Sequence, residues 1–345
     1  MTHVLVARLD NDGDVLLAGP AIRAAKRDAE RLTLLCGPHG LQAAALLPDV
    51  DDIVVHRAEW IDPEPVPFEN GPTRRLLLEL ARRAVDEAAI LTSFHQSPLP
   101  LALLLRLAGV SRIGATCADY PGSLLDVRHA IDDDVHEVER SLSLMRALGH
   151  ELAPSDDGAL RVQRPPAAQP FADPYVVVHP GASVPARAWA PPRHAELVAA
   201  LAGAGWHVAV TGSPDERELT ARVARAGAAA APARVRDLGG ATDLAQLAAV
   251  IAGAAAIVVG NTGPAHLAAA VGTPVVSLYA PTVPATRWRP WRVPHAILSE
   301  PVPCAGCRAR ICPVAGHPCL DELPLAAVLE AVERLATPAR EAVAA

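Results

Sequence analysis

Short apolar segments alternate with longer amphipathic ones along the whole chain. Residues 3–9, 175–179 and 256–259 are short runs rich in Val, Leu and Ile, and this pattern predicts buried strands. Residues 132–148 instead carry apolar side chains three or four positions apart, which predicts an amphipathic helix. Strands that alternate with helices in this way predict an α/β fold with parallel, doubly wound sheets.

The alternating pattern occurs twice, on either side of residues 153–174, a segment rich in Pro, Asp and Gln that has no periodicity. A chain of 345 residues also exceeds the size at which one core usually divides into two domains. We therefore expect two facing Rossmann-like domains, residues 1–160 and 174–323, with a ligand-binding cleft at the carboxyl ends of their strands. A last helix, within residues 324–337, is a candidate to cross back onto the first domain.

The composition narrows the class of protein. Hydrophobic residues make up 51% of the chain and charged residues 20%, as in a soluble globular protein. The net charge of −7 and the lack of a Lys/Arg-rich run argue against a nucleic acid as partner. The chain has neither a signal-peptide pattern nor an apolar run of about 18 residues. We therefore expect a cytoplasmic protein whose thiols are reduced.

Residues 254–291 contain a candidate phosphate-binding turn. The predicted strand 256–259 is followed by Asn261-Thr262-Gly263-Pro264, and Pro264 suits the first turn of a helix that Thr262 is placed to cap. A helix that starts directly after a strand presents free backbone N–H groups and the positive end of its dipole to an anion. An ordinary βαβ unit without a ligand is the alternative.

A second strand-to-helix turn lies near the start of the chain. Asn11-Asp12-Gly13 follows the strand predicted at residues 3–9, and a helix is predicted to begin near Asp14 or Val15. A carboxylate at the carboxyl end of a strand can face a substrate and remove a proton from it. By position alone, Asp14 could equally cap the helix.

Both turns resemble the signatures of one family. Residues 260–282, GNTGPAHLAAAVGTPVVSLYAPT, resemble the C-terminal signature of glycosyltransferase family 9, the heptosyltransferase family. Residues 8–27, RLDNDGDVLLAGPAIRAAKR, resemble its N-terminal signature. The resemblance implies the GT-B architecture, with the acceptor bound mainly by the first domain and the nucleotide by the second. It also implies inverting transfer that needs no metal and no cofactor.

The resemblance assigns two catalytic residues. Asp14 matches the carboxylate that, in the family, acts as the base and removes the proton of the acceptor hydroxyl. Arg187 lies in residues 180–189, which resemble the family's Pro-Gly-Ala-x4-Lys/Arg-x-Trp segment, and there its forked guanidinium would stabilise the leaving diphosphate. A solvent-exposed loop arginine is the alternative for Arg187.

The resemblance also assigns residues that bind the donor. Glu216 would accept hydrogen bonds from the ribose hydroxyls, although a carboxylate there also favours the helix dipole. His266 would contact the diphosphate or hold its turn, and an isolated buried histidine is the alternative. Asn261 stands where the family has an acid, which bears on the identity of the donor sugar. The remaining predicted binding residues are Gly13, Ser183, Gly212, Thr242, Thr262 and Gly263.

Four cysteines lie close together in the sequence. Cys304, Cys307, Cys312 and Cys319, with His317 nearby, have the spacing Cys-x2-Cys-x4-Cys-x6-Cys. Four thiols so close could bind a tetrahedral zinc ion, stay reduced or form a local disulfide. We predict no metal ligand among the site residues.

The function implied by the resemblance is transfer of heptose or a related sugar from ADP-heptose, or another nucleotide sugar, to an acceptor hydroxyl. The acceptor would be a lipopolysaccharide-like glycan, a glycolipid or another glycoside. A glycolipid acceptor would bring the protein to the inner face of the membrane as a peripheral protein. The alternatives are a non-catalytic nucleotide-sugar-binding or metal-binding protein on the same scaffold, and a nucleotide-sugar epimerase.

Overall fold

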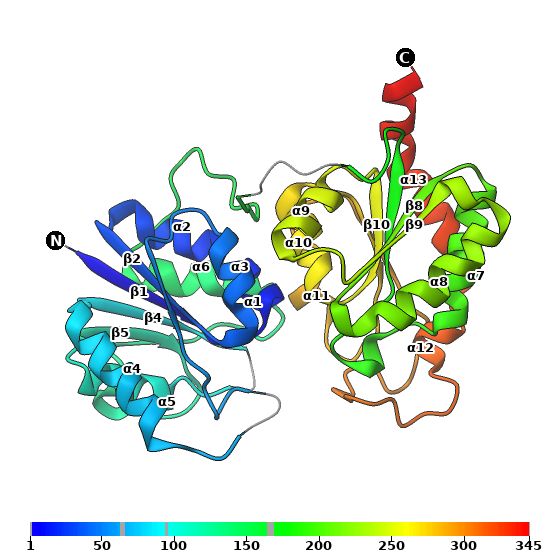
Figure 1. Cartoon of the computed structure of the whole chain (residues 1–345). Helices are drawn as coiled ribbons and strands as arrows, with labels where there is room; N and C mark the ends of the chain where they lie inside the picture. Colours follow the sequence, from blue (N-terminus) through cyan, green and yellow to red (C-terminus); the bar gives the residue numbers. More distant parts are fainter. Residues whose placement is uncertain (1, 63–65, 94–95, 164–168, 345) are drawn as a thin grey trace. The chain divides into compact units, whose positions relative to one another are not determined.

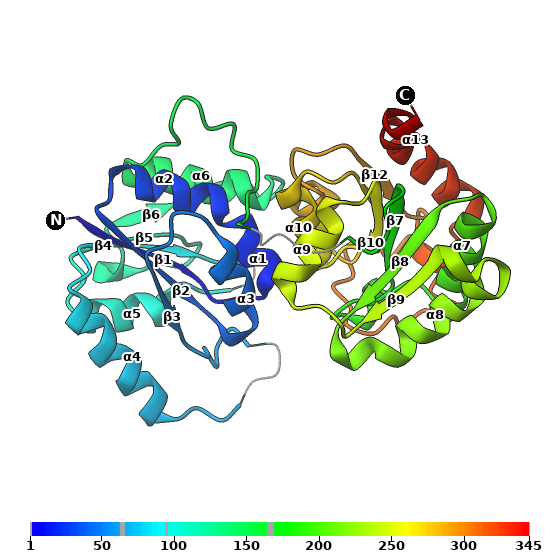
Figure 2. The same cartoon turned by 45° about the horizontal axis from the view of Figure 1, so that its top comes forward.

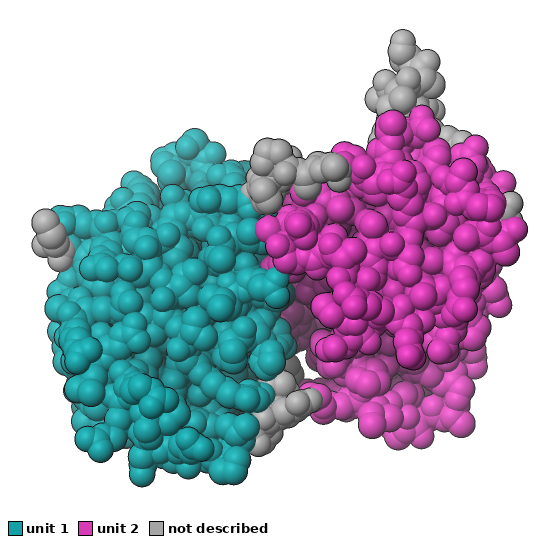
Figure 3. Space-filling view, viewed as in Figure 1, with its two compact units in different colours: residues 1–163 teal, residues 164–345 magenta. Residues whose placement is uncertain are grey.

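The computed structural model describes residues 2–62, 66–93, 96–163 and 169–344. The chain divides into two compact units, residues 1–163 and 164–345, which Figure 3 shows in teal and magenta. Each unit contains one six-stranded sheet whose strands are all parallel. The predicted doubly wound α/β fold is confirmed.

Unit 1 is built on a sheet of strand order β3-β2-β1-β4-β5-β6 (Figure 1). The central strand β1 is buried along its whole length and pairs in parallel with β2 and β4. A strand covered on both faces needs an uninterrupted apolar sequence, which explains the predicted run at the start of the chain. The strands are β1 (His3–Arg8), β2 (Arg31–Cys36), β3 (Asp52–Val55), β4 (Glu87–Leu91), β5 (Arg112–Thr116) and β6 (Val127–His129).

Helices cover both faces of this sheet. α2 and α6 pack together on one face, and α4 and α5 lie on the other (Figures 1 and 2). The helix predicted after β1 is divided at Ala18 into α1 and α2, and α1 begins earlier than expected, at Asp12. The helices are α1 (Asp12–Leu17), α2 (Gly19–Asp28), α3 (Leu41–Leu46), α4 (Asn70–Arg83), α5 (Leu99–Leu107) and α6 (Glu137–Leu148).

Unit 2 repeats the topology, with the strand order β12-β11-β10-β7-β8-β9. Read from β3 in unit 1 and from β9 in unit 2, each sheet has the strand order 3-2-1-4-5-6 that characterises the dinucleotide-binding Rossmann fold. The two central strands, β7 and β10, are completely buried. The strands are β7 (Tyr175–His179), β8 (His207–Gly212), β9 (Val235–Gly239), β10 (Ala256–Gly260), β11 (Val275–Leu278) and β12 (His295–Leu298).

The core of unit 2 lies between its sheet and α7, α8 and α13, and it includes the buried rings of Trp189 and Trp206. α13 packs on α7, β10, β11 and β12, which places this helix in unit 2. The crossing of the last helix to the first domain stays a prediction. The helices are α7 (Pro191–Gly203), α8 (Arg217–Ala230), α9 (Leu244–Ala252), α10 (Gly263–Val271), α11 (Ala285–Trp288), α12 (Pro318–Asp321) and α13 (Leu325–Ala344).

Candidate active site

The predicted site residues follow the carboxyl ends of the strands in each unit. The order of strands reverses between β1 and β4 in unit 1, and between β7 and β10 in unit 2. Loops that leave a parallel sheet at such a point run in opposite directions, and ligands bind between them. Gly13 and Asp14 follow β1, Ser183 and Arg187 follow β7, and Asn261, Thr262, Gly263 and His266 follow β10.

In unit 1, Asp14 is held by a buried arginine. Arg8, the last residue of β1, is 2% exposed, and its Nη2 donates a hydrogen bond to Asp14 Oδ1 at 2.8 Å. The same guanidinium forms ion pairs with Asp10, through Nε at 2.8 Å, and with Glu137, through Nη1 at 3.6 Å. One cation therefore faces three carboxylates, which come from the loop after β1 and from the helices α1 and α6.

The start of α1 determines where the Asp14 side chain points. Asn11 is the N-cap residue, and its carbonyl accepts hydrogen bonds from the N–H groups of Asp14 and Val15. Asp12 accepts a hydrogen bond from Ala43 N at 2.9 Å and so ties α1 to α3. The alternative in which Asp14 caps the helix is wrong, because its carboxylate is used by Arg8 instead.

The surroundings of Asp14 raise its pKa towards neutral pH. Its side chain is 22% exposed. Burial raises the pKa of Asp14 to about 6; Arg8 opposes this rise, while Asp10 and Glu137 add to it. Burial disfavours the charge of Arg8 as well, but the three carboxylates outweigh this effect and raise its pKa. A carboxylate with a pKa just below neutrality can act as a general base at physiological pH.

The loop after β4 completes this cluster. Ser93 accepts a hydrogen bond from Arg8 Nη2 at 2.9 Å and donates one to Asp10 Oδ2 at 3.3 Å. Gln96 donates from its side-chain amide to Asp10 Oδ1. Sequence reasoning missed Arg8, Asp10, Ser93, Gln96 and Glu137. Only a polar residue at the end of an apolar strand could have suggested Arg8, and nothing local connects it with Glu137.

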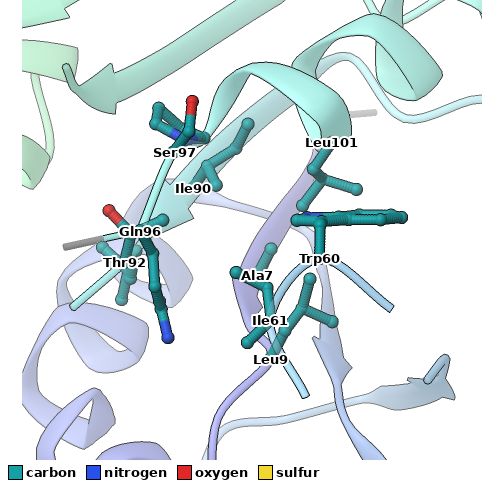
Figure 4. Close-up of a pocket in the computed structure, with 11 residues that line it drawn as sticks. Ala7, Leu9, Trp60, Ile61, Ile90, Thr92, Gln96, Ser97 and Leu101 are labelled. Carbon is teal, nitrogen blue, oxygen red and sulfur yellow. The ribbon is translucent and has the colours of Figure 1, made fainter. Parts of the chain in front are cut away.

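A small pocket borders the cluster on the side of Gln96 (Figure 4). Trp60, Ile61 and Leu101 form its apolar wall, and Thr92 and Ser97 contribute polar atoms. This pocket offers an apolar contact surface close to the carboxyl ends of β1 and β4.

In unit 2, the loop after β7 carries the predicted cation. Arg187 ends a short 3₁₀ helix, Pro185–Arg187, and its Nε donates to Thr282 Oγ1 at 3.3 Å. Ser183 is exposed at the start of the same loop. A Cβ atom added to Gly260 would lie 2.9 Å from the carbonyl oxygen of Arg187, so the Arg187 loop passes directly over the end of β10. The two loops at the switch point of this sheet are therefore neighbours.

The turn after β10 starts α10 as predicted, with one difference. Thr262 occupies the N-cap position, but its side chain makes no capping hydrogen bond, so the expected cap is wrong. Gly263 opens the helix, and His266 is buried in its first turn. Asn261 is 7% exposed and its Nδ2 donates to Ala280 O at 3.3 Å. The first N–H groups of α10 lie at an end where the helix dipole favours an anion.

Glu216 reaches from the loop after β8 to the loop after β7. Its carboxylate accepts a hydrogen bond from Ser213 N at 2.8 Å in a capping box. A Cβ atom on Gly181 would lie 1.9 Å from Glu216 Oε1, so only a glycine leaves room for this carboxylate. Gly212 ends β8 and is packed against Glu216 and Thr220. The capping role is thus present in the structure, and contact with a ribose stays a prediction.

Thr242 lies just before α9, and it is not the cap of that helix. The N-cap is Asp243, whose side chain accepts a hydrogen bond from Gln246 N at 2.7 Å. Thr242 is half-buried and lies two residues after Gly240, which has a positive φ of 64°. The role of Thr242 in binding the donor stays a prediction.

The cysteine segment supports the Arg187 loop. His317 Nε2 contacts Ala186 O at 3.1 Å, and Ala186 N donates to Arg310 O at 2.9 Å. The four cysteines line one pocket with Ala186 and Thr282, and burial raises the pKa of Cys319 to about 11. The cysteines of the described chain are unpaired, and no three His, Cys, Asp or Glu side chains there are arranged to hold a metal ion.

The sequence profile of glycosyltransferase family 9 (heptosyltransferase) matches residues 80–317. The chain belongs to this family. Lipopolysaccharide heptosyltransferase 1 of Pseudomonas aeruginosa is 36% identical over 253 residues, which cover 71% of this chain and 68% of that relative. Lipopolysaccharide heptosyltransferase 3 of Escherichia coli K12 is 32% identical over 165 residues, or 45% of this chain. The chain spans about half the length of this second relative, 47%.

Solved structures of heptosyltransferases have the same fold. The E. coli ADP-heptose lps heptosyltransferase II matches with a TM-score of 0.74 at 21% identity, over 98% of this chain and 99% of that one. The E. coli heptosyltransferase WaaC with ADP-2-deoxy-2-fluoro heptose matches with a TM-score of 0.69 at 22% identity, over 87% and 94%. The GT-B architecture of this heptosyltransferase-family chain is thereby confirmed.

A third structure bears on metals. It is the iron-containing dodecameric glycosyltransferase TibC from enterotoxigenic E. coli, with a TM-score of 0.58 at 15% identity, covering 97% of this chain and 76% of that one. A protein of the same fold is thus described as iron-containing. Among the helices that the structure describes, none combines the length and apolar character needed to cross a membrane.

Proposed function

We propose that this glycosyltransferase moves heptose from ADP-heptose to a hydroxyl group of a lipopolysaccharide acceptor, with inversion at the anomeric carbon. The names of the curated relatives support the acceptor class, and the WaaC complex with an ADP-heptose analogue supports the donor. The observation that carries the proposal is the Asp14 carboxylate, which follows β1 at the switch point and has a pKa of about 6.

In this mechanism, Asp14 accepts the proton of the acceptor hydroxyl. The oxygen then forms a bond to the anomeric carbon of the donor while the bond from that carbon to the diphosphate oxygen breaks. The electron pair of the broken bond stays on ADP, and attack from the opposite side inverts the configuration. A general base with a pKa near the working pH combines a large ionised fraction with useful basicity.

Residues of unit 2 would stabilise the departing ADP. Arg187 offers a forked cation that matches phosphate oxygens, and the N-terminus of α10, where Thr262 is the N-cap residue, offers the backbone N–H group of Gly263. Glu216 would accept hydrogen bonds from the ribose, and Asn261 and His266 would contact the sugar-diphosphate. Because Arg187 and the N-terminus of α10 supply positive charge without a metal, we propose that transfer needs neither a metal ion nor another cofactor. A lipid-linked acceptor would draw the protein to the membrane surface.

The test is to incubate the purified protein with a panel of nucleotide sugars and of lipopolysaccharide core acceptors truncated at successive sugars. We expect release of ADP that depends on the acceptor, and a product whose anomeric configuration, determined by NMR, is inverted. Release that stops after EDTA treatment and returns with a metal would contradict the metal-free mechanism. Binding of ADP-heptose without any turnover would point instead to a non-catalytic binding protein. Conversion of the sugar without ADP release would point to an epimerase.

A further inference from the structure

The three carboxylates around Arg8 are not equivalent. Asp10 has partners besides Arg8, because Gln96 and Ser93 donate hydrogen bonds to its two oxygens. Glu137 is 1% exposed and faces Arg8 from the start of α6. Asp14 is 22% exposed and contacts Arg8 through Oδ1, so its Oδ2 is left out of this ion pair. The cluster thus leaves one partly exposed carboxylate with an oxygen that can accept a proton.

Separate elements fix this arrangement. Arg8 is anchored by the β1 backbone, which pairs with Cys36 of β2 and with Leu91 of β4. His136 caps α6 by accepting a hydrogen bond from Val138 N at 3.2 Å, and this cap places Glu137 in the first turn. A guanidinium held this rigidly can hold a carboxylate in one orientation, which a flexible ammonium group does less well.

We infer that Arg8 is the positioning residue for Asp14: it fixes the orientation of the carboxylate and favours its ionised form, while Glu137 acts in the opposite sense. This inference rests on the proposed role of Asp14 as the base. The charged groups that face Asp14 are Arg8 from β1, Asp10 from the following loop and Glu137 from α6.

The charges predict opposite effects for two substitutions. Arg8→Met removes a cation that lowers the pKa of Asp14, so this pKa should rise. Glu137→Gln removes a negative charge that raises the pKa of Asp14, so it should fall. If Arg8 and Glu137 only supported the fold, their substitutions would not be expected to shift the pKa of Asp14 in opposite directions.

The experiment measures kcat/KM against pH with ADP-heptose and the active lipopolysaccharide core acceptor, because its acidic limb reports the free enzyme. We expect Arg8→Met to move this limb upward by about one pH unit or more; a shift of one unit, from about 6 to about 7, would by itself lower the ionised fraction of Asp14, and with it the rate at pH 7, about twofold. Glu137→Gln should move the limb downward. Arg8→Lys keeps the charge but loses the forked guanidinium. It should therefore lower kcat, yet move the acidic limb less than Arg8→Met does.

Arg23 provides the matched control. It is also a buried arginine of unit 1, and it forms a forked ion pair with Asp156 at 2.6 and 2.9 Å. Arg23→Met should destabilise the unit as Arg8→Met does, yet leave the acidic limb in place. If Arg8→Met does not fold, Arg8→Lys and Glu137→Gln carry the test.

The pKa of Asp14 can also be measured without turnover, from the ¹³C carboxyl signal that the Asp14→Asn variant lacks. A titration midpoint of this signal that lies at higher pH in Arg8→Met and at lower pH in Glu137→Gln supports the positioning role. An unmoved signal and an unmoved acidic limb in both variants overturn it, even if Asp14→Asn is inactive. If the signal moves as predicted but Asp14→Asn keeps full activity, the positioning role holds and the proposed base is wrong.

Discussion

Gly260 offers a sharp test of whether the Arg187 loop and the end of β10 form one binding surface. A Cβ atom at this position would lie 2.9 Å from the carbonyl oxygen of Arg187, closer than Cβ atoms approach other atoms in proteins. Because the obstructing atom belongs to the backbone, Gly260→Ala must push the Arg187 loop away from the start of α10. Overpacking of this kind costs about 1–3 kcal/mol of stability.

The consequence for ADP follows from the charge-assisted hydrogen bonds that Arg187 would donate to phosphate. Such bonds contribute about 1.5–3 kcal/mol, so Arg187→Ala should weaken ADP binding roughly 10- to 150-fold. Gly260→Ala displaces the cation without removing it, and we expect a smaller loss, about three- to tenfold. Adding Gly260→Ala to Arg187→Ala should then weaken ADP binding little further.

Calorimetric titration with ADP, together with thermal unfolding, measures both effects. Gly203→Ala is the control, because a Cβ atom at Gly203 meets no other group within 4 Å. A folded Gly260→Ala variant that binds ADP as the native protein does would refute the reasoning. The reasoning would also be refuted if adding Gly260→Ala to Arg187→Ala weakened ADP binding as much as Gly260→Ala alone does.

Three further substitutions test other contacts: Gly181→Ala and Glu216→Gln in unit 2, and Asp156→Asn in unit 1. Gly181→Ala should displace the Glu216 carboxylate, because the added Cβ atom would lie 1.9 Å from it. Both Gly181→Ala and Glu216→Gln should therefore raise KM for ADP-heptose several-fold. A KM that changes only in Glu216→Gln would contradict the proposed crowding. Asp156 has its pKa lowered to about 2, mainly by the hydrogen bond from Arg23, so the pair stabilises the fold above about pH 4 and this stability is lost as the pH falls towards 2. Asp156→Asn should therefore lower the free energy of unfolding by about 2 kcal/mol at pH 7 and by much less near pH 2, in denaturant titrations at the two pH values.

The sequence predicted the central strands well, but it did not predict the edge strands β6, β9 and β12. β1, β4, β7 and β10 are buried on both faces, so they are continuous apolar runs that stand out in any chain. β9 is mostly exposed or half-buried and contains Arg236 and Asp237. β6 and β12, at two of the other three edges, are also short and mostly half-buried.

The candidate site divides in the same way. The turns after β1 and β10 could be predicted, because Gly, Pro and small polar residues there determine how a strand leads into a helix. The partners of Asp14 could not, because Ser93 and Glu137 reach Arg8 only through the sheet topology and the cap of α6. The side chain of Thr262 also differed from the prediction, since N-cap preference is a tendency that local geometry can override.

Turnover by Asp14→Asn, measured beside its affinity for ADP, tests the proposed mechanism most directly. The exchange keeps the size of the side chain and removes the group that accepts the proton. We predict that acceptor-dependent release of ADP from ADP-heptose falls by about 10²-fold or more while the dissociation constant of ADP stays within about twofold. Release of ADP at the native rate, with the acceptor glycosylated in the same configuration, would contradict the assignment of Asp14 as the base.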